Sequence, residues 1–174
     1  MKTTTLELET KNHLEELYQR FLNDEKIKRM LDIPMHRGSN CYIHSFKVAK
    51  LAIKRALRRK KKHLALENIL VAGILHDYYL YNWRNNHDYR KKHARKHPYV
   101  ASENAGKDFG INNEIKRIIE THMWPINFSD FPSSTEARIV NNADTSIAFK
   151  EAMTSIKYKM KRKQKDLEFI SHLF

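Results

Sequence analysis

Two adjacent polar residues, His76 and Asp77, follow directly on an apolar run, Ala72 to Leu75. A polar side chain buried without a partner costs on the order of 1–3 kcal/mol, and more if it is charged. Imidazole nitrogens and carboxylate oxygens are good ligands for first-row transition metals. A shared cation explains why a chain would direct both side chains inward, so the pattern predicts a metal site at His76 and Asp77.

The same arrangement recurs elsewhere in the chain. Apolar residues lie three, four or seven positions from His44, His122 and Asp144, at Val48, Leu51, Ile115, Ile118, Val140 and Ile147. These spacings put each polar residue on the apolar face of a helix. Taken singly, a histidine in such a place is as well explained by a hydrogen bond to a carbonyl, and Asp144 by a cap or an ion pair. The repetition on four helices favours one shared metal site.

Other histidines fit this pattern less well or not at all. His97 stands directly before Pro98, a residue that favours the first position of a helix, and is a further candidate ligand. His87 and Asp88 form a second His-Asp pair, but their neighbours are polar, which predicts a solvated loop. His63 and His93 lie in basic runs, and we do not expect them to be ligands.

The chain that must position these residues is predicted to be all-α. It contains only four glycines and four prolines, and alternation typical of strands is scarce. Gly110 should end a helix, and Asn112 or Asn113 should cap the next. The predicted helices run from Leu6 into the Leu31 region with a break near Asn23 and Asp24, and over Cys41–Lys60, Leu66–Tyr81, Pro98–Phe109, Asn113–Trp124 and Ser134–Met153, with a last helix from there to near the C-terminus.

Composition narrows the function classes further. The 174 residues are expected to form one domain, and no apolar stretch approaches the roughly 20 residues of a membrane span, so we expect a cytoplasmic protein with no membrane partner. Cys41 is the only cysteine, which excludes an internal disulfide and sites built from several thiolates. The formal net charge of +13 is explained either by solvated helix faces or by attraction of anions or RNA.

The order of the candidate ligands resembles a known family. His44, His76 with Asp77, and Asp144 reproduce the H…HD…D pattern of the HD-domain superfamily of metal-dependent phosphohydrolases. The phrases HDYYLYNW and HMWP are similar to those of small bacterial members. Asn82 replaces an Asp, and Thr145 a Lys, that such members often carry. The resemblance extends roughly from residue 41 to residue 153.

The resemblance implies a single helical-bundle HD domain, residues 1–174 with a core at about 41–153, and additional N- and C-terminal helices. It also implies two divalent transition metal ions, with Mn, Fe, Zn, Co and Ni undistinguished. One would be bound by His44, His76, Asp77 and Asp144, and Asp77 would bridge to a second at His97 and His122. His76, Asp77 and Arg84 are the expected catalytic residues, and cations that could contact a phosphate are Arg37, Lys47, Arg84 and Lys91.

The predicted activity is hydrolysis of a small phosphorylated substrate, a nucleotide or another phosphate mono- or diester, by a metal-activated water. Two alternatives stay open. The two-metal subset also resembles di-iron oxygenases of the same fold, and the basic charge fits an RNA- or anion-binding module in which a metal is only structural. The sequence contains no P-loop, dinucleotide fingerprint or nucleophile motif that would indicate other chemistry.

Overall fold

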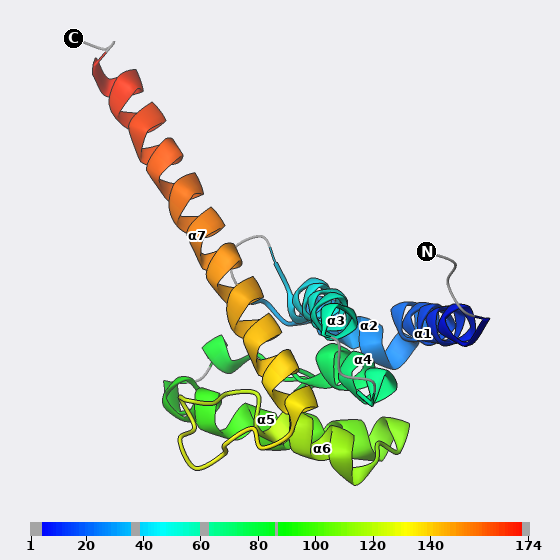
Figure 1. Ribbon diagram of the computed structural model, residues 1–174. Coiled ribbons are helices and arrows are strands. Elements are labelled where there is room, and N and C mark those ends of the chain that lie inside the picture. Colours follow the sequence, from blue (N-terminus) through cyan, green and yellow to red (C-terminus); the bar gives the residue numbers. More distant parts are fainter. Residues whose placement is uncertain (1–4, 36–38, 60–62, 86, 172–174) are drawn as a thin grey trace.

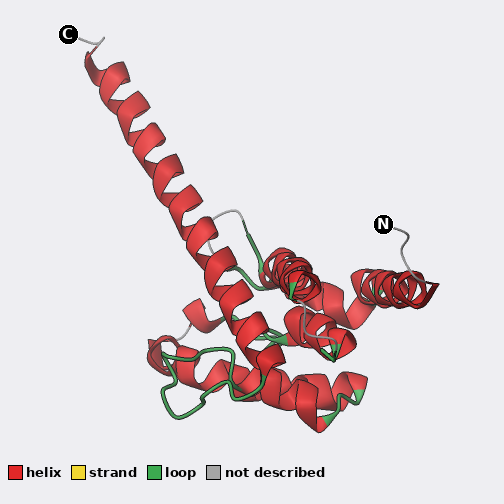
Figure 2. Ribbon diagram, in the orientation of Figure 1, coloured by secondary structure: helices red, strands yellow, loops and turns green. Residues whose placement is uncertain are grey.

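The computed structural model describes residues 5–35, 39–59, 63–85 and 87–171, and these contain helices and loops but no strand (Figure 2). The predicted all-α fold is therefore confirmed. The α-helices are α1 (Thr5–Asn23), α2 (Glu25–Lys28), α3 (Cys41–Arg58), α4 (Leu66–Leu75), α5 (His87–Phe109), α6 (Asn113–Glu120) and α7 (Thr135–Ser171), with 3-10 turns η1 (Arg29–Asp32) and η2 (Trp83–Asn85). Arg37 lies outside the described residues.

The helices pack around α4. Every residue of α4 from Asn68 to Leu75 is buried, because α3, α6 and α7 cover it on different sides. Figure 1 shows α5 and α6 at one end of the body and α7 crossing it, with the C-terminal half of α7 extending well beyond the other helices. Within the described residues, no helix combines the length and the apolar composition that crossing a membrane requires.

Side-chain caps define several helix starts. Asp24 accepts hydrogen bonds from the backbone N–H groups of Lys26 and Ile27, which confirms the predicted break after α1. Asn112 caps α6 through the N–H of Ile115 at 2.8 Å, as predicted. Gly110 ends α5 with φ of 62°, a left-handed conformation that glycine adopts without steric cost.

Two helices end earlier than their apolar patterns predicted. The helix that carries His76 stops at Leu75 and not at Tyr81, because a turn follows and Leu80 adopts φ of 54°, which no helix can continue through. The helix before His122 stops at Glu120 and not at Trp124. In both places the polar ligand comes just after the helix, in a turn at the end of the apolar stripe.

Two other helices are longer than predicted. Helix α5 begins at His87 and contains Pro98, so the prediction of a solvated loop at His87 and Asp88 was wrong. The segment from His87 to His97 is rich in Lys and Arg, which favour the helical conformation, so the helix begins well before the proline. Helix α7 runs unbroken through Met153, where two helices were predicted, since no glycine or proline interrupts it.

The contact between α3 and α4 requires a glycine. A Cβ atom on Gly73 would lie 2.8 Å from the Cα of Ala49, and real Cβ atoms essentially never approach a backbone atom so closely. The absence of a side chain at Gly73 thus lets the two helices approach, and the helices carry His44 and His76. Gly106 in α5 is different, because a Cβ there would meet no atom within 4 Å.

We therefore expect Gly73→Ala to lower the free energy of unfolding by about 1–3 kcal/mol, because α3 and α4 would have to separate. Gly106→Ala is the matched control. It should leave stability unchanged or raise it by up to about 1 kcal/mol, because alanine is the better helix former. Urea unfolding followed by circular dichroism measures both. Equal effects of the two substitutions would contradict the close approach.

Candidate metal centre

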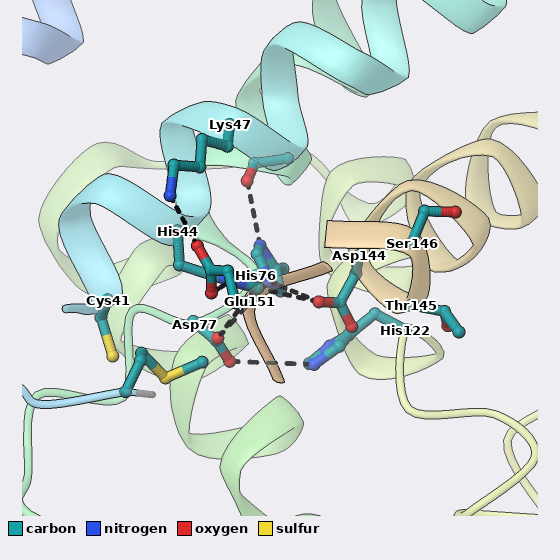
Figure 3. A network of polar contacts seen from close by, with 12 residues as sticks. Cys41, His44, Lys47, His76, Asp77, His122, Asp144, Thr145, Ser146 and Glu151 are labelled. Carbon is teal, nitrogen blue, oxygen red and sulfur yellow. Dashed lines mark hydrogen bonds and ion pairs between the residues drawn. The ribbon is translucent and has the colours of Figure 1, made fainter. Parts of the chain in front are cut away.

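The structure brings the six predicted ligands together in the core. They come from six places in the chain: His44 in α3, His76 at the end of α4, Asp77 in the following turn, His97 in α5, His122 just after α6, and Asp144 in α7. Figure 3 shows the side chains of His44, His76, Asp77, His122 and Asp144 converging. Three overlapping triads have ligand atoms within 4.8 Å of one another: His44, His76, Asp77; His76, His122, Asp144; and Asp77, His97, His122.

Three of the four histidines are oriented by backbone carbonyl groups. The Nδ1 atoms of His76, His97 and His122 lie 2.9, 2.9 and 2.7 Å from the carbonyl oxygens of Gly73, His93 and Ile119. Because a carbonyl oxygen only accepts, each Nδ1 must carry the hydrogen. Each neutral ring then presents Nε2 as a free lone pair. Histidines that bind metals almost always have this arrangement.

The Nε2 atoms of His97 and His122 lie only 2.9 Å apart. If both Nδ1 atoms carry the hydrogens, two lone pairs face each other at this distance. Only a proton or a cation between the two nitrogens removes that repulsion. The contact is therefore evidence for a positive centre at this position.

His76 provides a second sign of a ligand site. Its Nε2 atom is fully buried and has no hydrogen-bond partner among the described residues. The nearest carboxylate oxygen, Oδ2 of Asp77, is 3.5 Å away, too far for a good hydrogen bond. A buried nitrogen left in this way costs free energy unless another group binds it. Nitrogen and oxygen donors alone suit a divalent transition metal, so these residues fit such an ion.

Asp77 lies between two groups of histidines. Its Oδ2 atom is 3.9 Å from Nε2 of His44 and 3.5 Å from Nε2 of His76. Its Oδ1 atom is 3.3 Å from Nε2 of His97 and 3.9 Å from Nε2 of His122. The two oxygens of one carboxylate thus face different pairs of nitrogens. Asp144 joins the first pair, with Oδ1 3.0 Å from Nε2 of His44 and 3.7 Å from that of His76.

Burial and charge set the protonation of the cluster. Burial, with the neighbouring His97 and His76, lowers the pKa of His122 to about 3. Burial raises the pKa of Asp77, but His76, His97 and His122 outweigh it and hold that pKa well below its usual range. The pKa of Asp144 is lowered too, because the hydrogen bond from His44 and the nearby ring of His76 outweigh burial. At neutral pH both carboxylates are therefore ionised and His122 is neutral, which are the forms that bind metals.

At neutral pH His44 carries a proton, whose charge partly balances those of the two carboxylates. Burial lowers its pKa, but hydrogen bonds to Asp144 and Glu151 outweigh burial and raise it to about 10. A cation at Nε2 of His44 therefore has to displace a proton. Its Nδ1 remains bonded to Oε2 of Glu151 at 3.0 Å.

Glu151 is a functional candidate that sequence reasoning missed. Besides the contact with His44, its Oε1 atom accepts hydrogen bonds from Lys47 at 2.8 Å and from Ser39 at 3.2 Å. The hydrogen bonds with His44 and Lys47 outweigh burial and lower the pKa of Glu151 to about 2. The available signal was its position, because Glu151 follows Asp144 by seven residues and so shares its helix face.

The predicted cations lie in different surroundings. Lys47 is half exposed and bound to Glu151, beside the cluster. Arg84, a predicted catalytic residue, donates to the carbonyl oxygens of Pro34 and Met35, and its guanidinium lies over the ring of Trp83. The side chain of Lys91 lies outside the described residues. Arg84 is thus held in a loop contact and does not join the six ligands.

His93 has a structural role beside the cluster. Its ring stacks on His97 with centroids 4.5 Å apart, and on Trp83 at 5.0 Å. Its carbonyl group accepts the hydrogen bond that orients His97. Burial and the neighbouring His97 lower the pKa of His93 to about 4. It belongs to none of the three triads found among the described residues.

Glu151→Ala should lower the free energy of unfolding by about 1–3 kcal/mol, because the buried Nδ1–H of His44 would lose its acceptor. Glu151→Gln should cost less, since its amide oxygen can still accept. Urea unfolding at neutral pH measures both. Glu103→Ala, at an exposed position in the middle of α5, is the control and should change stability by less than about 0.5 kcal/mol. If Glu151→Ala behaves like this control, Glu151 does not support His44.

Comparison with known proteins places this cluster in a family. A family model described as HD domain matches residues 41–148, more than half of the chain. The match begins at the first residue of α3, ends within α7 and contains all six predicted ligands. No curated protein and no solved structure matches. The resemblance seen in the H…HD…D order is confirmed: the chain belongs to the HD-domain family.

Proposed function

We propose that this protein is a phosphohydrolase that uses two divalent metal ions to cleave a small phosphate mono- or diester, such as a nucleotide. HD-domain proteins are in general metal-dependent phosphohydrolases, and the clustered His and Asp side chains fit divalent metal binding. The observation that carries the proposal is Asp77, whose two oxygens face two separate pairs of Nε2 atoms. One bridging carboxylate between two sets of nitrogens is the arrangement that a two-metal hydrolase needs.

Four residues would hold the first ion and three the second. The first set is His44, His76, Asp144 and Oδ2 of Asp77, and the second is His97, His122 and Oδ1 of Asp77. When bound, the ions supply a Lewis acid for phosphoryl oxygens and lower the pKa of a bound water toward neutrality. The protein holds the ligand rings in place through the Nδ1 hydrogen bonds, so that little reorganisation is needed during the reaction.

The side of the cluster that carries Asp144 is the proposed entrance for the substrate. Asp144 has the most exposed side chain of the six, at 13%, against 0% for His44 and His76. Lys47 lies on α3 one turn after His44, and its amino group is half exposed. Its positive charge can attract a phosphate to this side. Arg84, which is engaged with two carbonyl groups, is the weaker candidate for this task.

Metal content and ester hydrolysis, measured on the same samples, test the proposal. We expect about two transition metal ions per chain, and cleavage of p-nitrophenyl phosphate or of its bis ester that stops on chelation and returns with added metal. Asp77→Asn keeps the shape of the side chain but removes its charge, so it should lose metal and lower the rate by about 100-fold or more. His13→Ala, an exposed histidine in α1, is the control and should retain both.

Three outcomes would contradict the proposal. Hydrolysis that survives chelation would show that metal ions do not carry the reaction. Oxygen uptake by an iron-loaded sample, with no ester cleaved, would indicate the oxygenase chemistry instead. RNA binding that falls steeply with salt and persists in folded Asp77→Asn, in a protein without hydrolase activity, would indicate a basic binding module.

A further inference from the structure

A second polar site lies between α3 and α7, outside the metal cluster. The last turns of α3 and the first turns of α7 enclose a hollow of about 440 Å³. It is lined by Arg55, Arg58, Arg59, Ile139, Asn142, Thr145 and Ser146. Ile139 is buried, whereas the polar residues reach solvent, so the hollow has an apolar side and a polar rim.

The hollow is rich in positive charge. Among the described residues that line it, three are arginines and none is acidic. The guanidinium of Arg55 is held by Oγ of Ser146 at 2.8 Å, and Ser146 in turn donates to the carbonyl oxygen of Asn142 at 2.7 Å. Arg58 and Arg59 are exposed and have no carboxylate partner among the described residues. Like charges converging on one hollow repel one another, and a bound anion would offset this repulsion.

The hollow faces away from the metal cluster. Figure 3 shows Thr145 and Ser146 pointing to the other side of α7 from Asp144. On α3, Arg55 follows His44 by eleven residues, which is roughly 16 Å along a helix. A ligand here would touch α3 and α7, the helices that carry His44 and Asp144, without contacting those two residues themselves.

The lining residues indicate which chemical class would fit. Planar guanidinium groups bind phosphate oxygens in pairs of parallel hydrogen bonds, and the side-chain amide of Asn142 offers a further donor. Among the described lining residues none is aromatic, so nothing in the hollow would stack on a base. Single-stranded nucleic acids are usually bound by aromatic side chains along a basic groove. The hollow therefore suits phosphate groups more than a polynucleotide.

We propose that this hollow, lined by Arg55, Arg58 and Arg59, is a second binding site that takes a small molecule carrying two or more linked phosphate groups. Three guanidinium groups match the charge of a diphosphate or triphosphate better than that of a single phosphate. The site is independent of the proposed hydrolase activity, because none of its residues is a candidate metal ligand. A ligand bound there would hold α3 against α7.

Calorimetric titration of the full chain with pyrophosphate tests the site. The protein is first treated with chelator and then dialysed into 150 mM NaCl, so that metal ions do not bind the probe. We expect binding by the native chain and a loss of at least about tenfold in affinity in Arg58→Ala with Arg59→Ala. Arg58→Lys with Arg59→Lys keeps the net charge and should still weaken binding several-fold, because lysine lacks the planar fork.

Lys50→Ala with Lys54→Ala is the matched control, since it removes two exposed charges from the same helix outside the hollow. It should change the affinity less than twofold. Equal weakening in this control and in the double arginine variant would show a diffuse positive field and overturn the proposal. So would an absence of binding at millimolar pyrophosphate, or native affinity in the arginine variant.

A single-stranded RNA oligomer, titrated in parallel, distinguishes a site for a small polyphosphate from a site for nucleic acid. Binding of the RNA more tightly than pyrophosphate, lost in Arg58→Ala with Arg59→Ala, would make the hollow a nucleic-acid contact and overturn the small-molecule site. Metal content and ester hydrolysis of the arginine variant should equal those of the native chain. Failure of the hydrolase proposal would therefore leave this result unaffected, and the reverse also holds.

Discussion

The structure depends on one cluster in the core, in which four imidazole rings and two carboxylates lie close together. The surrounding residues have to make the burial of these polar groups stable. Three rings are held by carbonyl groups of the preceding helical turn, and the fourth by Glu151. Each bond uses Nδ1 and directs Nε2 inward, so the donors that remain converge on a small volume. Divalent cations bound among these side chains would satisfy all of them, whereas hydrogen bonds within the cluster leave Nε2 of His76 without a partner among the described residues.

The helical bundle brings the candidate ligands together from different helices and turns. Helix α4 is buried on all sides, and its last residue leads directly into His76 and Asp77. Gly73 allows α3 to approach α4 closely enough for His44 to reach the same point. Helix α7 then supplies Asp144 from the opposite side and, two turns later, Glu151. Helices α4 and α6 end just before the ligands, at Leu75 and Glu120. His76, Asp77 and His122 therefore lie in turns, where their side chains can point into the cluster.

Residue type and apolar spacing predicted His44, His76 with Asp77, His122 and Asp144, because each lies on or at the end of an apolar stripe of a helix. His97 was predicted instead from its place before Pro98 and from the resemblance to the family. Glu151 was missed because it does not belong to the H…HD…D pattern, and only its distance of seven residues from Asp144 marks the helix face that it shares with that ligand. Apolar and aromatic residues continue to Tyr81, so the end of α4 at Leu75 and the left-handed conformation of Leu80 were not visible in the sequence. The arginine-lined hollow forms where the end of α3 meets the start of α7. These segments are far apart in the sequence, so apolar spacing within either one could not predict the hollow.

The two halves of the cluster differ in how far apart their residues lie along the chain. His97 and His122 are separated by 25 residues, whereas His44 and Asp144 are separated by 100. Closing the longer loop costs more conformational entropy, so long-range contacts of this kind form late in folding. The pair from α5 and the turn after α6 can thus assemble while the chain is still being synthesised. The complete cluster must wait until α7 has left the ribosome and docked on α3.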